Sequence, residues 1–418
     1  MSAWIEVSMD ERIIIIGAGE AGIRAALTLR QQGCRTPITL FGDEPHAPYE
    51  RPPLSKAGGG EPVAIGDLVA MERVELRLGE RVEHIDRAHR QLVTRHGERL
   101  PYRQLLLATG ARARRLVLPG LAADAALTLR TLDDARSIFA RVAPGKRVVI
   151  VGGGFVGLEL AAALIGKGAR VSLLESQLRL LQRAVPAELA RVVEEEHRAR
   201  GVDLYLGAGI ARAEPRGEGA RLTLNDGREL EAELLVAGIG SEPNTRLAAG
   251  AGLALDNGIA VDAELRTGDP AIFAAGDCCS FPHALYRQQR LRLESWRCAR
   301  EQGETAALNM LGGRHAYAPA PWFWSDQFDL GLQIVGLPHL ADRTLCRELG
   351  ERARLLFHLD RDGRLLAASG IGPGNAVAKD IKLAERLINL RACPDPALLA
   401  DPGVRLKQLL SAATGEAA

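Results

Sequence analysis

The sequence has little of the chemistry that marks a metal site or a disulfide framework. Its 418 residues include only six cysteines, which form no C-x-x-C pair, and its nine histidines do not cluster with them. This spacing argues against a zinc or iron–sulfur site, so we expect no bound metal. The neighbours Cys278 and Cys279 are expected to be small buried side chains, and all six thiols to be free in a reducing cytoplasm.

An excess of charge of one sign is also missing, as are long apolar runs. The formal net charge is +1, whereas nucleic-acid-binding proteins usually have a strong basic excess. No apolar run approaches the roughly 20 residues of a membrane helix. The N-terminal MSAWIEVSMDER is too acidic and too short of apolar residues for a signal peptide. We therefore expect a cytoplasmic protein of two or three domains, with neither nucleic acid nor membrane as a partner.

A glycine-rich turn follows the first aliphatic run of the chain. The segment RIIIIGAGEAGIRAALTLRQQG begins with four isoleucines, which fit a strand buried on both faces of a parallel sheet. The spacing G-x-G-x-x-G, which suits a turn that binds a pyrophosphate, is then formed by Gly17, Gly19 and Gly22. The next strand, PITLFGDE, ends at Asp43 (or Glu44), where a carboxylate can accept hydrogen bonds from an adenosine ribose.

The same pattern returns about 135 residues later in KRVVIVGGGFVGLELAAALIGKGARVSLLES, with glycines at Gly152, Gly154 and Gly157. Two fingerprints predict two bound dinucleotides. Glu175, at the end of the following strand, would bind a free 2′-hydroxyl and repel a 2′-phosphate, which favours NADH over NADPH. Arg179 and Arg183 lie downstream and would favour NADPH if they faced the nucleotide. We expect Glu175 to dominate.

Three further strands end in glycine and support the prediction of two nucleotides. They are LLLATGARAR, LLVAGIGSEPN and AIFAAGDCCS. Such ends place backbone amides beside a ligand at the carboxyl edge of a sheet. The candidate cofactor-binding residues at these ends are Ala108, Thr109, Gly110, Gly238 and Asp277.

Taken together, these segments resemble a known family. GAGEAG, PYERPPLSK, LLATGA, TLRTLDDA, VVIVGGGFVGLELA, GIGSEPN, IFAAGDC, LESWRCAREQG and PWFWSDQF occur in the order seen in FAD-dependent NADH:ferredoxin reductases. These are the reductase components of bacterial aromatic-ring dioxygenases, similar to putidaredoxin and rubredoxin reductases. The resemblance implies an α/β, glutathione-reductase-like flavoprotein fold with two dinucleotide-binding domains and a C-terminal α+β domain. The expected boundaries are 10–117 with 258–322 for the FAD-binding domain, 118–257 for the NADH-binding domain, and 323–418 for the C-terminal domain.

The segment YERPPLSK receives its role from this resemblance. Its prolines fix φ and remove donors, so we expect an ordered, non-helical arm. The resemblance implies that Arg51 and Lys56 reach the FAD, with Lys56 near the N5 edge, where a cation stabilises negative charge. It also implies that Glu159 pairs with this lysine where the nicotinamide enters. The alternatives are a solvated loop lysine and a carboxylate that only interacts favourably with the helix dipole.

Further residues are assigned to the flavin by the same resemblance. Asp277 would meet the ribityl chain, and Arg130 would contact FAD unless it forms a surface salt bridge. Trp296 and Trp324 are two of only four tryptophans, and their rings can stack beside the isoalloxazine or exclude water. The alternative for Trp324 is a place in an interdomain core. We expect Trp324 to act in catalysis with Lys56 and Glu159.

The acceptor is predicted from a missing cysteine. Flavin disulfide reductases of this fold carry a redox cysteine pair shortly after the second strand, but FGDEPHAPYERPPLSK has none. Electrons from NADH must then leave FAD for an external acceptor, which we expect to be a [2Fe–2S] ferredoxin serving an oxygenase. An NADH oxidase, a quinone reductase and a non-enzymatic redox-gated module are the alternatives. The cationic segments 287–297 and 379–391 are candidate docking patches, or else ordinary solvated faces.

Overall fold

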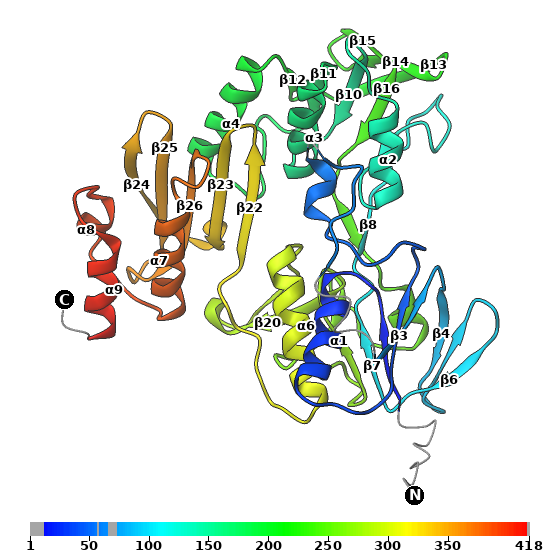
Figure 1. The fold of residues 1–418 in the computed structure, drawn as a ribbon. Coiled ribbons are helices and arrows are strands. Elements are labelled where there is room, and N and C mark those ends of the chain that lie inside the picture. The colour runs from blue at the N-terminus through cyan, green and yellow to red at the C-terminus, as the bar shows by residue number, and fades with distance from the viewer. Residues whose placement is uncertain (1–11, 57, 66–72, 416–418) are drawn as a thin grey trace, which may run out of the picture. The chain divides into compact units, whose positions relative to one another are not determined.

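The computed structural model describes residues 12–56, 58–65 and 73–415 (Figure 1). The chain divides into two compact units, each assembled from separate segments. Unit 1 holds the described residues up to Glu50, then Pro62–Arg112 and Glu242–Pro319, whereas unit 2 holds Arg51–Glu61, Ala113–Ser241 and the residues from Ala320 onward. The domain boundaries expected from the sequence stay a prediction.

Unit 1 is built on a parallel sheet with the strand order β19-β7-β1-β2-β3. Its central strand β1 is buried along its whole length, because β2 and β7 pair with its two edges and both of its faces are covered. The helices α1 and α6 pack so closely that a Cβ on Gly303 would lie 2.3 Å from the carbonyl oxygen of Ala21. The elements are β1 (Ile13–Ile16), α1 (Glu20–Gln31), β2 (Ile38–Gly42), β3 (Val74–Leu78), β7 (Gln104–Leu107), β19 (Ile272–Ala274) and α6 (Trp296–Met310).

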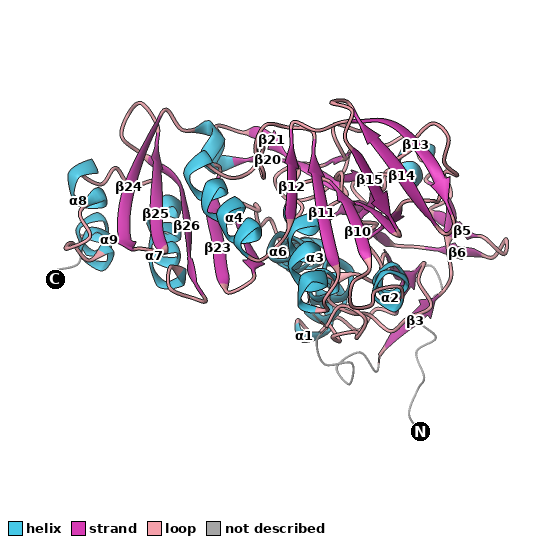
Figure 2. Cartoon of the chain, turned by 90° about the horizontal axis from the view of Figure 1, so that it is seen from above, coloured by secondary structure: helices cyan, strands magenta, loops and turns pink. Residues whose placement is uncertain are grey.

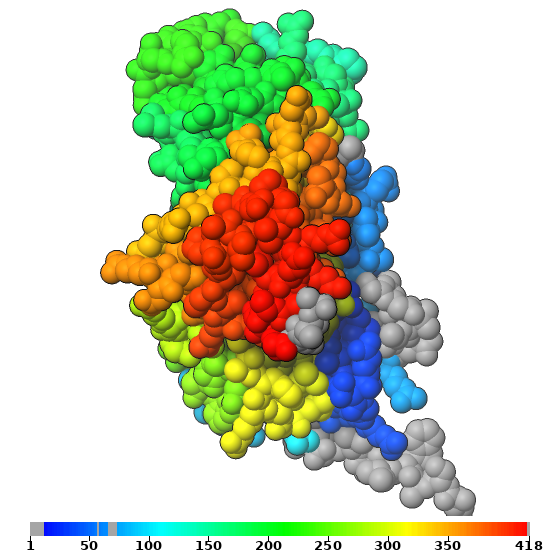
Figure 3. All heavy atoms as spheres, turned by 90° about the vertical axis from the view of Figure 1, so that its left-hand side faces the viewer, coloured from blue at the N-terminus to red at the C-terminus, as the bar shows by residue number. Residues whose placement is uncertain are grey.

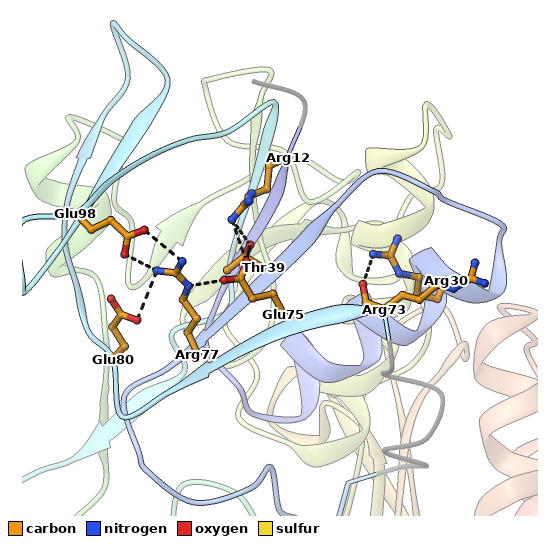
Figure 4. Close-up of polar contacts among 8 residues, drawn as sticks. All are labelled: Arg12, Arg30, Thr39, Arg73, Glu75, Arg77, Glu80 and Glu98. Carbon is orange, nitrogen blue, oxygen red and sulfur yellow. Dashed lines mark hydrogen bonds and ion pairs between the residues drawn. The ribbon is translucent and has the colours of Figure 1, made fainter. Parts of the chain in front are cut away.

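The edge strand β3 carries a cluster of charged side chains (Figure 4). Arg77 forms ion pairs with Glu75 and Glu98, and Arg12 pairs with Glu75 at 3.0 Å. Burial opposes ionisation of Glu75, but the hydrogen bonds from Arg77 and Thr39 outweigh it and lower the pKa of this carboxyl. Charges on an edge strand discourage pairing with another chain, so this cluster protects the end of the sheet.

Two small sheets complete unit 1, the antiparallel sheet β4-β5-β6 and the mixed sheet β18-β20-β21, in which β18 runs parallel to β20. The remaining elements of the unit are β4 (Val82–Asp86), β5 (Gln91–Thr94), β6 (Arg99–Pro101), α5 (Arg246–Gly250), β18 (Ile259–Ala260), β20 (Cys279–His283), a 3₁₀ turn (Ala284–Tyr286) and β21 (Gln289–Leu291). The chain passes between the units within the paired strands β8 (Ala111–Ala113) and β17 (Ser241–Pro243).

Unit 2 contains a second parallel sheet of the same kind, with the order β12-β11-β10-β16-β9, and a three-stranded antiparallel sheet β13-β14-β15. Figure 2 shows β10, β11 and β12 side by side. Its elements are β9 (Leu127–Thr128), α2 (Leu132–Ala140), β10 (Arg147–Val151), α3 (Phe155–Gly166), β11 (Arg170–Glu175), α4 (Ala187–Ala199), β12 (Asp203–Leu206), β13 (Ile210–Arg216), β14 (Gly219–Leu224), β15 (Glu229–Ala232) and β16 (Leu234–Ala237).

The C-terminal part of unit 2 is an antiparallel sheet with the order β22-β23-β26-β25-β24. One face of this sheet joins the core of the second parallel sheet through Leu330, Leu332 and Ile334, which alternate along β23. In Figure 3 the last residues of the described chain, in red, lie in front of the orange residues that precede them. The elements are β22 (Trp322–Gln327), β23 (Leu330–Gly336), a 3₁₀ turn (Pro338–Leu340), β24 (Arg343–Gly350), β25 (Ala353–Leu359), β26 (Leu365–Pro373), α7 (Ala378–Asn389), α8 (Pro396–Ala400) and α9 (Leu406–Thr414).

Among the residues that the structure describes, none of the helices has both the length and the apolar character that a membrane crossing needs.

Candidate functional site

The first glycine turn has the geometry of a dinucleotide-binding turn. Gly17 has a φ of +120°, and a Cβ there would lie 2.0 Å from the carbonyl oxygen of Ala108. A Cβ on Gly22 would lie 1.9 Å from the carbonyl oxygen of Gly17, whereas one on Gly19 would have no described atom within 4 Å. The outer two glycines therefore allow close packing, and the middle one leaves open space at the start of α1.

The second turn repeats this construction in unit 2. Gly152 has a φ of +115°, and its Cβ would lie 2.3 Å from the carbonyl oxygen of Gly238. A Cβ on Gly157 would lie 2.1 Å from the carbonyl oxygen of Gly152, and Gly154 is again open. In the described chain, no side chain caps the first turn of α1 or α3. Because the first N–H groups of a helix need partners and attract anions, both turns fit a pyrophosphate.

The predicted strand-end residues lie beside these turns. Thr109 donates its hydroxyl to the carbonyl of Asn244 at 2.7 Å, and the Asn244 amide donates to the carbonyl of Thr109 at 2.8 Å. Gly110, with a φ of +63°, completes this turn after β7. Asp277 follows β19 by three residues, and its carbonyl accepts from Arg292. Unit 1 thus brings the turn of Gly17 and the end of β7 together.

Glu175 occupies the end of β11 and is bound to the second glycine turn. Its carboxylate accepts from the backbone N–H of Gly153 at 2.7 Å and from that of Gln177 at 2.7 Å. Arg179 is committed to the carbonyls of Gln182 and Val185, while the guanidinium of Arg183 lies near Gly240.

The carboxylates after β2 have protein partners. Asp43 forms an exposed ion pair with Arg81, and Glu44 accepts a short hydrogen bond from the Tyr49 hydroxyl. A role for either in binding a ribose stays a prediction.

Arg51 and Arg130 lie together in unit 2. The guanidinium of Arg51 donates to the carbonyl of Arg130 at 2.6 Å, and the N–H of Arg130 donates to Asp134 at 2.9 Å. Asp134 also completes a capping box with Thr131 at the start of α2. Both arginines are therefore held next to α2, and their contact with FAD stays a prediction.

The expectation of a non-helical arm is wrong in one respect. Residues 52–55 form a single 3₁₀ turn, Pro52–Ser55, which ends before Lys56. Prolines are tolerated in the first positions of a helical turn, because the N–H groups they lack would have no partner there. The turn is stabilised by backbone bonds from Leu54 to Arg51 and from Lys56 to Pro53.

Lys56 and Glu159 come together, as the resemblance implied. The Lys56 ammonium lies 3.4 Å from Glu159 and 2.6 Å from Asp326, which is half exposed. Each oxygen of the nearly buried Glu159 carboxylate accepts a hydrogen bond from a hydroxyl. The donors are Ser55 at 2.5 Å and Ser325 at 2.5 Å. Unit 2 thus builds a compact cluster of one cation, two carboxylates and two hydroxyls.

Three members of this cluster were missed by the sequence analysis: Ser55, Ser325 and Asp326. A weak signal existed, because S-D-Q interrupts the aromatic strand PWFWSDQF with three polar residues. Polar residues in a buried strand need partners, but the sequence does not name the partner.

The two tryptophans lie in different units. Trp324 stacks on Trp322 with ring centroids 5.3 Å apart, while Phe323 on the other face of β22 meets Phe155 of α3. Trp296 begins α6, where the guanidinium of Arg300 lies 5.7 Å from its ring centroid. Their contacts with a flavin stay a prediction.

All six cysteines are free in the structure, including the buried neighbours Cys278 and Cys279. Burial raises the pKa of both thiols, which disfavours the reactive thiolate. No cluster of three or more histidine, cysteine or acidic side chains in the described residues is arranged to hold a metal ion.

Comparison with known proteins accords with this geometry. Residues 11–303 match the pyridine nucleotide-disulphide oxidoreductase family, and residues 322–410 match the reductase C-terminal family. The chain is 40% identical to the ferredoxin–NAD(+) reductase component of the anthranilate 1,2-dioxygenase system of Burkholderia cepacia, over 95% of this chain and 98% of the relative. It is 35% identical to the putidaredoxin reductase of Pseudomonas putida, over 98% of this chain and 99% of the relative.

A solved structure agrees over nearly the whole length. The covalent putidaredoxin reductase–putidaredoxin complex contains a chain that matches with a TM-score of 0.91 and 35% identity, over 97% of this chain and 100% of that chain. The predicted fold class, a two-dinucleotide flavoprotein fold with a C-terminal domain, is confirmed.

Proposed function

The chain belongs to the pyridine nucleotide-disulphide oxidoreductase family, and we propose that it is an FAD-dependent reductase that passes electrons from NADH to a [2Fe–2S] ferredoxin. The ferredoxin would in turn serve an oxygenase, of the aromatic-ring dioxygenase or the P450 type. The relatives support this assignment, because one is the ferredoxin–NAD(+) reductase component of a dioxygenase system and another is a putidaredoxin reductase.

The two glycine turns supply the cofactor sites of this proposal. We assign the turn of Gly17 to FAD and the turn of Gly152 to NADH, with Glu175 selecting NADH. When bound, FAD takes two electrons from NADH and can release them one at a time. The protein contributes open backbone at Gly19 and Gly154 and the N-terminal ends of α1 and α3.

The observation that carries the proposal is a reductase fold without a thiol at the site. The sequence has no cysteine between Cys34 and Cys278, so the arm Arg51–Glu61 and the Lys56 cluster contain none. Cys278 and Cys279 are buried thiols with raised pKa values. Electrons must therefore leave the protein through an external acceptor.

Lys56 and Glu159 are assigned to the hydride-transfer site. Glu159 follows the second glycine turn directly, two residues after Gly157, which associates the pair with the NADH-binding turn. The Lys56 ammonium, held by two carboxylates, supplies a fixed positive charge that stabilises negative charge during reduction.

We assign ferredoxin docking to the exposed cationic stripe of α7. Lys379, Lys382 and Arg386 are exposed and fall on one face of the helix at spacings of three and four residues. In the other candidate segment, Arg290 and Arg292 donate to backbone carbonyls of their own unit. The stripe on α7 therefore offers the freer set of cations for an acidic partner.

We place this enzyme in the cytoplasm, where NADH is available and where six free thiols stay reduced.

Cytochrome c reduction by NADH tests the function. Activity should require FAD and should rise many-fold when a [2Fe–2S] ferredoxin is added. Equal activity without ferredoxin, together with rapid reduction of oxygen or quinone, would instead establish the NADH oxidase or quinone reductase alternative.

A further inference from the structure

A chain of hydrogen bonds runs from Glu159 into the protein interior along one face of β22. Ser325 donates to Glu159 at 2.5 Å, and the side-chain amide of Gln327 donates to the Ser325 hydroxyl at 2.8 Å. His197, on α4, lies 2.8 Å from the Gln327 carbonyl oxygen through its Nε2 atom. The side chains of His197, Ser325 and Gln327 are completely buried, so water does not compete for these bonds.

The donors in this chain all point the same way. Since the amide nitrogen of Gln327 donates to Ser325, its oxygen must accept, and His197 must carry its hydrogen on Nε2. The Ser325 oxygen accepts from Gln327, which leaves its own hydrogen directed at Glu159. Burial lowers the pKa of His197, which favours the neutral ring. Its Nδ1 has no hydrogen-bond partner in the described chain, consistent with an unprotonated nitrogen.

The end of the hydrogen-bond chain that is farthest from Glu159 is anchored to α4. The ring of His197 meets the edge of Phe328 at a centroid distance of 4.9 Å. A closed set of four ion pairs then joins α4 to the turns of the C-terminal sheet, formed by Glu196, Arg200, Asp329 and Arg352. The strand that carries Ser325 is thereby fixed against the helix that carries His197.

We propose that Ser325, Gln327 and His197 are positioning residues that fix the orientation of the Glu159 carboxylate and, through it, of Lys56. Ser55 holds the second carboxylate oxygen, so both oxygens have a fixed donor. This inference rests on the proposed function in one respect, namely that the Lys56–Glu159 pair belongs to the hydride-transfer site. The chain of donors itself does not depend on that assignment.

The tautomer of His197 gives a test that is independent of activity. In protein labelled with ¹⁵N-histidine, long-range proton–nitrogen spectra at pH 7 should show His197 as the neutral Nε2–H form, with its signal identified by loss in His197→Gln. In Gln327→Met the ring loses its acceptor, and the ¹⁵N shifts should change. A cationic ring or an Nδ1–H tautomer in the wild-type protein would contradict the proposed hydrogen-bond chain from His197 to Glu159.

Stopped-flow reduction of the bound flavin by NADH tests the consequence for the site. Ser325→Ala removes one of two donors to a carboxylate and should slow this step about tenfold, whereas Ser325→Thr keeps the hydroxyl and should restore it. Gln327→Met should slow the same step with little change in the apparent Kd for NADH. In a Glu159→Gln background, Ser325→Ala should have little further effect.

Ser369→Ala is the matched control, because Ser369 is also a buried serine of the C-terminal sheet bonded to a histidine, His358. It should leave flavin reduction unchanged. A wild-type rate in Ser325→Ala, or the same loss with and without Glu159, would refute the proposal. If NADH does not reduce the flavin of the wild-type protein, the proposed function fails, and the histidine spectra still decide the chain of donors.

Discussion

The ammonium of Lys56 lies 2.6 Å from Asp326, closer than the 3.4 Å that separates it from Glu159. The two carboxylates differ in their surroundings. Asp326 is half exposed, whereas the Glu159 side chain is only 10% exposed and holds two hydroxyl donors. Solvent weakens an exposed ion pair, so the more distant Glu159 is expected to be the stronger influence on the lysine.

Lys56→Met should slow reduction of the flavin by NADH in stopped flow. Glu159→Ala should slow the same step by about tenfold or more. The double variant should lose less than the two single effects combined, because the two residues act as a pair. Asp326→Asn should change the rate less than about fivefold, since an exposed pair is worth about 1 kcal/mol or less. Additive and near-silent effects at Lys56 and Glu159 would indicate a solvated loop lysine.

The choice of nucleotide should depend on Glu175. We expect the wild-type protein to prefer NADH over NADPH by at least about tenfold in kcat/KM, which corresponds to about 1.4 kcal/mol. Glu175→Ala should narrow this preference by removing the repulsion of a 2′-phosphate. Steady-state kinetics with both nucleotides measure the ratio. Arg179→Ala is a useful comparison, because this arginine is bound to backbone carbonyls and should not alter nucleotide preference. A wild-type preference for NADPH would contradict the assignment.

The two glycine turns should fail in different ways. Gly17→Ala forces a Cβ to within 2.0 Å of Ala108, at a backbone conformation that suits glycine, and the purified protein should lose its bound FAD. Gly152→Ala has the corresponding clash with Gly238 and should retain FAD but bind NADH poorly. Visible absorbance and nucleotide titration measure the two outcomes. Gly166→Ala, at the open end of α3, should keep both properties. If Gly17→Ala instead weakened NADH binding and Gly152→Ala lost FAD, the two cofactor assignments would have to be exchanged.

Ferredoxin reduction should depend on salt and on α7. Reversing the charge at Lys379 and Lys382 should raise the KM for an acidic [2Fe–2S] ferredoxin without changing flavin reduction by NADH. Rising salt should slow ferredoxin reduction in the wild-type protein while ferricyanide reduction stays nearly constant. Reversal at Arg290 serves as the comparison from the other segment. Equal salt dependence for both acceptors would argue against a cationic docking site.

His358 should make the C-terminal sheet sensitive to acid. Burial lowers the pKa of this histidine from 6.5 to about 4, and its ring contacts Thr344 and Ser369. Between these pH values the unfolded chain binds a proton that the folded chain does not, so the free energy of unfolding falls as the pH drops from 6.5 to 4. The loss from this one group is about 3 kcal/mol at most. Urea unfolding should show that the free energy of unfolding falls less between pH 7 and pH 4.5 in His358→Gln than in the wild-type protein. An equal loss in both would exclude this histidine as the cause.

The glycine turns were predictable because their signal is local. Strand, turn and helix occupy one continuous segment, and the clash at Gly17 or Gly152 is a direct consequence of the spacing. The pairing of Lys56 with Glu159 came from the resemblance, since 103 residues separate them and no local rule connects them. The partners Ser325, Gln327 and His197 could not be predicted, because buried polar residues pair according to tertiary packing. The 3₁₀ turn at residues 52–55 does not follow from the prolines alone, because proline breaks a helix interior but is tolerated in the first positions of a helical turn.

The division of the chain into interleaved segments determines when each part can form during synthesis. The sheet of unit 1 contains β7, which is made early, and β19, which follows it by about 165 residues after the whole segment Ala113–Ser241. A ribosome that adds roughly 5–20 residues per second leaves the edge of β7 unpaired for some ten seconds or more. The parallel sheet around β10 is complete by residue 237 and can fold first. A nascent chain that ends before Ile272 therefore has all strands of the sheet around β10 but lacks β19 of the sheet in unit 1. The site assigned to FAD is completed late in translation.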